Sequence, residues 1–172
     1  DGLLIARIAI IAFFLMSCIT LTAQDYTKTY YNEKYAVDKG ASLVIQNKFG
    51  DIHCQAWDES SVSVNVTVKV DASSQEKANR VFEKIEIELT GTPSKVEGKT
   101  SVGNISNADY SVDYEIRMPR WINLDLDNQF GSIYLDESDG LAKINLEYGD
   151  MEANAFNGPN TELTIKFSNV ET

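Results

Sequence analysis

Acidic side chains two residues apart are the groups in this sequence best placed to do chemistry. Asp125 and Asp127 lie in the alternating segment INLDLD, and further carboxylates follow at Asp136, Glu137, Asp139, Asp150 and Glu152. On a β-strand, residues i and i+2 point to the same side, so we expect Asp125 and Asp127 both to project outward. Such carboxylates could serve a carbohydrate-active enzyme, bind calcium, or form a solvated acidic face. We favour the solvated face.

The sole histidine is followed directly by a cysteine. Adjacent strand residues point to opposite faces, so His53 is expected to face outward and Cys54 inward. This arrangement disfavours a Cys–His nucleophilic pair, and one such His and Cys are too few for a zinc set. The segment GTPSKVEGKT lacks the spacing of a phosphate-binding loop. We therefore expect no catalytic, cofactor-binding or metal-binding residues, and no cofactor.

Two tryptophans fall near the ends of predicted strands. Trp57 and Trp121, together with Asp125 and Asp127, form our candidate ligand surface. Exposed aromatic side chains can bind a sugar or anchor a partner protein. The alternative is that the aromatic residues cover the ends of the hydrophobic core.

Charge and composition limit the partners. The 172 residues carry a formal net charge of −11, which disfavours binding to a nucleic-acid backbone. Hydrophobic residues make up 43% of the chain, enough to bury a core. We expect any ligand to be a surface glycan or a protein, and the oligomeric state is left open.

The first residues are typical of an export signal. Residues 1–23 contain an early Arg7, an apolar run and small residues before a polar segment, as in a secretory signal peptide. Cleavage after Ala23 would release a chain beginning at Gln24. Alternatively, LMSC resembles a lipobox, in which Cys18 would carry a lipid. The mature chain would keep Cys54 without an intramolecular disulfide partner.

A short phrase occurs four times. FGDI (49–52), FGSI (130–133), YGDM (148–151) and FSNV (167–170), here called the corner motifs, follow strands with alternating apolar residues. The apolar parity switches across each motif, which indicates a corner between two strands, with Gly50, Gly131 and Gly149 supplying backbone freedom. We expect Phe49, Phe130, Tyr148 and Phe167 to fill equivalent inner core positions. Stacked units of this kind predict a β-solenoid or β-helix; an antiparallel meander is the alternative.

A β–α–β insertion is predicted at about residues 61–118, between the first unit and the others. SVSVNVTVKV alternates as a strand, and Ser73 with Glu76 matches a helix capping box. IEIEL and YSVDYEIRMP read as further strands. The segment between them, residues 90–109, reads as polar and turn-rich. The fold class is therefore mainly β, with one amphipathic helix that should cover an edge or end of the sheet.

Together these features resemble a bacterial family. The signal peptide, NKFGDIHCQAW, the Val-rich strand, INLDLDNQFGSIYL and LEYGDMEA are similar to the putative-adhesin domain of unknown function, akin to the autotransporter-adhesin head GIN domain. The resemblance spans about residues 40–172. It implies a solenoid-like fold and supplies no catalytic residues.

This resemblance completes the predicted organisation. We expect a signal peptide (1–23), an N-terminal extension (24–40) and a domain at 41–172. Members of the family generally have further units after the last one in this domain. The predicted function is a non-enzymatic adhesin or binding module, exported to the periplasm, outer-membrane surface or extracellular space. The alternatives are a carbohydrate-active β-helix enzyme and an envelope-signalling or assembly module.

Overall fold

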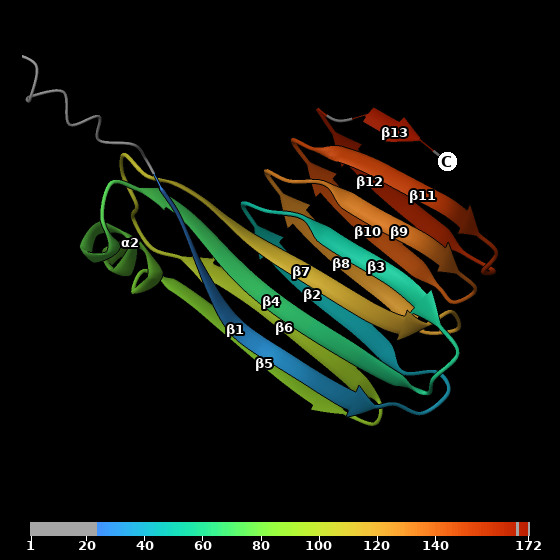
Figure 1. The fold of residues 1–172 in the computed structure, drawn as a ribbon. Helices are drawn as coiled ribbons and strands as arrows, with labels where there is room; N and C mark the ends of the chain where they lie inside the picture. The colour runs from blue at the N-terminus through green and yellow to red at the C-terminus, as the bar shows by residue number, and fades with distance from the viewer. Residues whose placement is uncertain (1–23, 168, 172) are drawn as a thin grey trace, which may run out of the picture.

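The computed structural model describes residues 24–167 and 169–171, so the predictions on the leader, Cys18 and Ala23 lie outside the described residues. These residues form two mixed β-sheets and one helix (Figure 1). Sheet A has the strand order β1 (Gln24–Ala36), β4 (Ser61–Ala72), β7 (Asp109–Pro119), β3 (Ile52–Trp57), β9 (Ile133–Ser138), β11 (Asp150–Phe156), β13 (Asn169–Glu171). Sheet B has the order β12 (Thr161–Lys166), β10 (Ala142–Glu147), β8 (Asn123–Gln129), β2 (Ser42–Lys48), β6 (Lys95–Val102), β5 (Ile85–Thr92).

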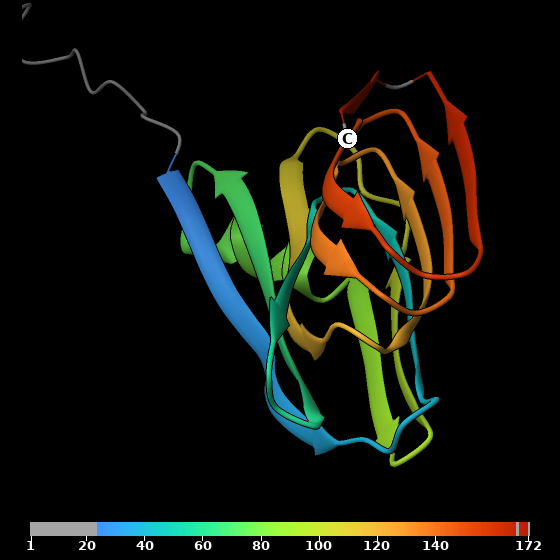
Figure 2. The same ribbon diagram turned by 90° about the vertical axis from the view of Figure 1, so that its right-hand side faces the viewer.

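The two sheets lie face to face and enclose the core (Figure 2). Alternate residues of each strand point inward, as the period of two predicts. In β8, for example, Leu124, Leu126 and Asn128 are buried while the residues between them face solvent or are half-buried. For the described residues, the prediction of a mainly β fold with one helix is confirmed.

The four corner motifs lie in register. Sheet B pairs β2, β8, β10 and β12 in parallel, so that Ile45 lies beside Leu126, and Leu126 beside Ile144. Sheet A pairs β3, β9, β11 and β13 in parallel, with Ile52 beside Ile133. Each of these four strands of sheet B therefore turns through one corner motif into a strand of sheet A, and we call this strand–corner–strand unit a rung.

Antiparallel strands extend both sheets beyond the first rung. β4 pairs with β7 and β1, and β5 pairs with β6. Residues 24–36, which lie within the predicted N-terminal extension, form the edge strand β1 of sheet A. β6 lies within the segment expected to be polar and turn-rich, so that expectation was wrong for residues 95–102.

Helix α2 (Gln75–Phe82) follows β4 and packs on it through Ala78, Val81 and Phe82. Its N-cap is Ser74 rather than Ser73, because the Ser74 side chain accepts the hydrogen bond from the amide of Lys77 at 3.3 Å. The helix ends at Phe82, and Ile85 begins β5.

The backbone at each corner differs from the prediction. The aromatic residue, and not the glycine, has the left-handed conformation: φ is 62° at Phe49, 58° at Phe130, 59° at Tyr148 and 54° at Phe167. This conformation is costly for residues other than glycine. Among the corner glycines, Gly50 has a positive φ of 154°, whereas Gly131 and Gly149 do not.

Close backbone approach explains the glycines. A Cβ at Gly131 would overlap the carbonyl of Gly50 in the neighbouring rung, and a Cβ at Gly149 would overlap that of Gly131. The buried side-chain amides of Asn47 and Asn128 hydrogen-bond to the backbone at these corners. The Asn47 side chain donates to the Val112 carbonyl at 2.9 Å, and the Asn128 side chain donates to the Gly50 carbonyl at 2.9 Å.

The aromatic residues of the motif do not fill the core, so that part of the prediction was wrong. Phe130 is 42% exposed, Tyr148 45% and Phe167 76%. The left-handed residue ends the extended backbone, so the alternation of the strand no longer decides where its side chain points. The buried positions are taken by the alternating residues before and after the corner, among them Leu126 and Ile133.

The polar residue of each motif links neighbouring rungs. Asp51 Oδ1 accepts a hydrogen bond from the amide of Ser132 at 2.7 Å, and the Ser132 hydroxyl accepts one from the amide of Asp150 at 3.2 Å. Asp150 Oδ1 in turn accepts from the side chain of Asn169 at 3.0 Å. A small side chain with an acceptor oxygen is therefore required at this position of the repeat.

Replacing Asp51 with alanine should lower the free energy of unfolding by about 1–2 kcal/mol, because the half-buried amide of Ser132 loses its acceptor. Asp51→Asn keeps an oxygen at this position and should cost clearly less. Urea denaturation of the three proteins measures both effects. Equal stability of the alanine variant and the wild type would contradict this role.

The buried side chains of Cys54 and Tyr114 should make the protein less stable at alkaline pH. Burial raises the pKa of the Cys54 thiol from 9.0 to about 12, with a contribution from the charge of Glu115. Burial also raises the pKa of Tyr114 from 10.0 to about 12, against a hydrogen bond with Thr100 that lowers it. Above pH 9 the unfolded chain releases protons that the folded chain retains, so the free energy of unfolding falls as pH rises from about 9 to 12.

Urea midpoints between pH 8 and 11 test this expectation. The decline should begin near pH 9, and Cys54→Ala should make its first part shallower, whatever its effect at pH 8. A midpoint that is constant from pH 8.5 to 10.5 in the wild type would contradict the assignment.

Candidate functional site

The four residues predicted as a ligand surface do not come together. Trp57 ends β3 in sheet A, where its indole N–H donates to the Ser61 carbonyl at 2.7 Å. Trp121 lies between β7 and β8 and packs against the core. Asp125 and Asp127 lie on the outer face of β8 in sheet B, pointing away from the core as expected. Trp57 and Trp121 thus make structural contacts within the protein, whereas the two carboxylates lie on the outer surface of sheet B.

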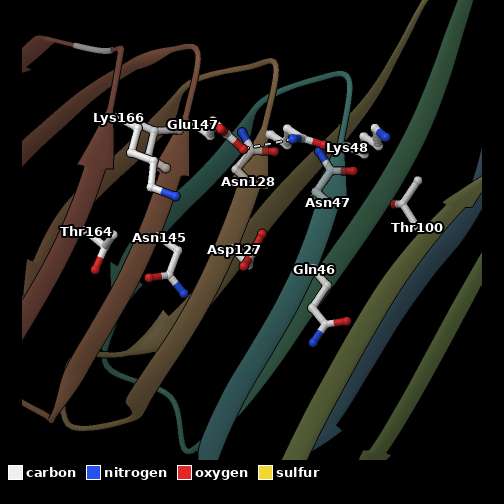
Figure 3. Close-up of a pocket in the computed structure, with 12 residues that line it drawn as sticks. Gln46, Asn47, Lys48, Thr100, Asp127, Asn128, Asn145, Glu147, Thr164 and Lys166 are labelled. Carbon is white, nitrogen blue, oxygen red and sulfur yellow. Dashed lines mark hydrogen bonds between the residues drawn. The ribbon is translucent and has the colours of Figure 1, made fainter.

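That surface is a regular array of polar side chains on the outside of sheet B. Parallel register aligns the members of one row, each on its own strand: Gln46, Asp127, Asn145 and Thr164. A second row lies two residues further along the same strands: Lys48, Gln129, Glu147 and Lys166. We call these eight side chains the polar face. Figure 3 shows the first row crossing four neighbouring strands.

A shallow groove with a volume of about 390 Å³ runs over the polar face. All eight side chains line it, together with Asn47, Asn128 and Leu146 from the same strands and Thr100 from β6. The two rows in its lining run across the strands, because each strand contributes one residue to each row at an inter-strand spacing of about 4.8 Å.

The charges on this face compensate one another. Gln129 donates to the Glu147 carboxylate at 2.8 Å within the second row. Asp125, beside the face, lies 3.9 Å from the ammonium of Lys143. The Lys48 ammonium sits 5.2 Å from the centre of the Phe49 ring. The one pair of opposite charges among these contacts, Asp125 and Lys143, is solvent-exposed to a large extent, so it adds little to the stability of the fold.

The aromatic residues of the corner motifs form a continuous stack beside the second row. We call Phe49, Phe130, Tyr148 and Phe167 the aromatic ladder. Successive ring centres are 5.1, 5.1 and 4.9 Å apart, with interplanar angles of 9°, 4° and 4°. Tyr110 closes one end with an edge-on contact to Phe49 at 5.3 Å. Because the inner rings, Phe130 and Tyr148, are covered on both faces, they present mainly ring edges to solvent, whereas Phe167 at the end of the stack is 76% exposed.

On the outer face of sheet A, His53 stacks on Tyr134 with ring centres 4.4 Å apart. Its register neighbours are Glu115 on β7 and Tyr134 on β9. Cys54 is buried on the opposite side of β3, as the alternation predicts. Within residues 24–167 and 169–171, no three His, Cys, Asp or Glu side chains converge as a metal-ion site.

The polar face was only partly predictable from the sequence. Alternation placed Asp125 and Asp127 outward, but Gln46 and Thr164 reach the same row only through strand pairing over 81 and 37 residues of chain. The repeat itself was the available signal. Aligning the corner motifs aligns the residues one and three positions before the aromatic residue, and these prove to be the two rows.

Comparisons with known proteins complete the description. No family model and no curated protein matches the sequence. Among solved structures, a putative cell adhesion protein from Clostridium sporogenes is 12% identical, with 87% of this chain and 98% of that chain covered and a TM-score of 0.38. A putative adhesin from Parabacteroides distasonis is 13% identical, covering 86% and 67%, with a TM-score of 0.36. A putative lipid binding protein from the same species is 10% identical, covering 86% and 68%, with a TM-score of 0.39. In the described part of the chain, no helix has the length and apolar character to cross a membrane.

Proposed function

We propose that this chain is a non-enzymatic binding module of the cell envelope or cell surface, and that it contacts its ligand through the polar face and the aromatic ladder. The observation that carries the proposal is the alignment of eight polar side chains in two rows across four hydrogen-bonded strands. Side chains on paired strands are held at fixed spacing, which suits recognition of an extended ligand.

We also propose that the rungs belong to a β-solenoid. In support, the four corner motifs repeat with the same strand pairing, the same left-handed aromatic residue and the same polar link to the next rung. A solenoid provides long flat faces on which one row of side chains can be repeated. The polar face is such a surface.

The proposal includes no catalytic step. Acid–base catalysis needs carboxylates in an enclosed site whose surroundings adjust their proton affinity. Asp127 is exposed on an open face, and Asp125 has Lys143 as its neighbour. We therefore expect no hydrolysis of polysaccharides, and the same result for Asp125→Asn/Asp127→Asn.

Export is the remaining part of the proposal, and it rests on the sequence of residues 1–23. Mass spectrometry of the protein from its native envelope should find Gln24 at the N-terminus, or a lipid on Cys18 if the lipobox is used. An intact leader would contradict both forms of export.

A binding array of glycans and matrix proteins, with a hydrolysis assay in parallel, tests the function. The purified protein should capture at least one ligand without cleaving it. The quadruple variant Gln46→Ala/Asp127→Ala/Asn145→Ala/Thr164→Ala should lose that ligand while keeping its melting temperature within a few degrees. Capture that is unaffected by the variant, or cleavage of a polysaccharide, would overturn the proposal.

A further inference from the structure

We infer that the groove on the polar face takes a neutral, hydroxyl-rich polymer, namely a strand of neutral polysaccharide, lying across β2, β8, β10 and β12. This inference rests on the proposed function and names the ligand class of the same site. It is argued from the charge of the groove, the hydrogen-bonding groups that line it, and its shape.

The groove is electrically balanced although the protein is not. Its charged members are Lys48, Lys166, Asp127 and Glu147, two cations and two anions, in a chain with a formal net charge of −11. An anionic polymer would be repelled by the protein as a whole and gain no compensating cationic patch in the groove. A cationic polymer would find a stronger attraction elsewhere on the acidic surface. A neutral polymer meets neither obstacle.

The uncharged members match hydroxyl groups. Gln46, Gln129 and Asn145 carry side-chain amides, and Thr164 carries a hydroxyl. An amide both donates and accepts hydrogen bonds, as a sugar hydroxyl does, so a pair can form in either direction. The flanking carboxylates and ammonium groups extend the same capacity with charge-assisted bonds.

The shape of the site sets the direction of the polymer. Four strands at an inter-strand spacing of about 4.8 Å give rows roughly 14 Å long, with one polar group at each step. The aromatic ladder runs parallel to the rows, because each of its residues directly follows a member of the second row, although its rings are not among the residues that line the groove. A ligand lying along the rows contacts a group on every strand, whereas one lying along a strand leaves the array within two residues.

A folded protein partner is less well matched to this face. Protein interfaces take most of their binding energy from a central cluster of buried aromatic or apolar anchors. The eight side chains of the polar face include no such anchor, and the faces of the inner ladder rings are already covered by one another.

Affinity electrophoresis in gels containing one polysaccharide each tests the inference. The neutral probes are dextran, mannan and laminarin; alginate is the anionic probe and chitosan the cationic one. We expect at least one neutral probe to retard the protein, with affinity changing less than about twofold between 50 and 500 mM NaCl, because no net charge is neutralised. Gln46→Ala/Asn145→Ala should weaken retardation at least tenfold, and Gln55→Ala, on the outer face of sheet A, should leave it unchanged.

The outcomes separate this inference from the proposed function. Retardation by alginate or chitosan alone, or by no neutral probe, overturns the ligand class. If the array nevertheless shows capture of a protein that the quadruple variant loses, the proposed function stands without this inference. Neutral retardation that is equal in the wild type and Gln46→Ala/Asn145→Ala overturns the location of the site. Melting temperatures of all variants within a few degrees of the wild type establish that binding, and not folding, has changed.

Discussion

Replacing Gly131 with valine is expected to lower the free energy of unfolding by at least about 3 kcal/mol, at the upper end of the range for overpacking. A Cβ at this position would overlap the Gly50 carbonyl, which is backbone and cannot rotate away. The second rung would have to separate from the first, weakening the pairing of both sheets. For a chain of this size the melting temperature should fall by roughly 6–12 °C.

Gly103→Ala is the matched control. A Cβ at Gly103 would meet its nearest neighbour, the Lys84 carbonyl, at 3.4 Å, and the hydrogen bond from the Gly103 amide to that carbonyl would remain. Its effect should stay within about 0.5 kcal/mol. A Gly131→Val protein as stable as Gly103→Ala would contradict the close packing of the corners.

The second large effect is expected at Leu126. This side chain is fully buried between Ile45 and Ile144 of the neighbouring strands, so Leu126→Ala removes packing in the middle of the stack and leaves a cavity. The expected loss is about 2–5 kcal/mol, measured by urea or thermal unfolding.

Phe130→Ala is the companion variant, and it separates the ladder from the core. Phe130 is 42% exposed, and its contacts are two stacked rings. Losing both contacts should cost about 1–2 kcal/mol, clearly less than Leu126→Ala although the deleted side chain is larger. A Phe130→Ala protein less stable than Leu126→Ala would place the aromatic ladder in the core after all.

These corners show what the repeat could and could not reveal. Aligning the motifs makes Ile52 equivalent to Ile133, and Leu126 equivalent to Ile144. The structure pairs these same residues on neighbouring strands, so the repeat was a sound guide to strand register. The inward placement of Phe130 failed because alternation holds only while the backbone stays extended. Phe130 has φ 58°, so the backbone is no longer extended there, and no residue type in the sequence directly indicates this left-handed conformation.

Two strands escaped prediction for different physical reasons. In β6 the inward residues include Gly98 and Thr100, which pack against Tyr114 from the opposite sheet, so the strand lacks the apolar alternation that marks the others. In β1 the register shifts between Thr29 and Tyr31, so one alternation pattern does not run through the strand. Both depend on contacts with residues distant in sequence.

The candidate site shows the same division. The outward direction of Asp125 and Asp127 followed from their spacing, whereas their neighbours Gln46 and Thr164 come from strands that only the stacked fold brings together. The tryptophans looked like ligand contacts from residue type alone. Residue type alone does not identify a ligand contact, because Trp57 donates a hydrogen bond to the Ser61 carbonyl and Trp121 packs on the core.

Amide chemical-shift mapping of the isotopically labelled protein, titrated with the ligand captured in the binding array, tests the central claim most directly. The account predicts that the largest shifts fall on β2, β8, β10 and β12, at residues such as Gln46, Asn145 and Lys166, with smaller shifts at the adjoining Tyr148. Shifts confined to the outer face of sheet A, around His53 and Glu115, would contradict it.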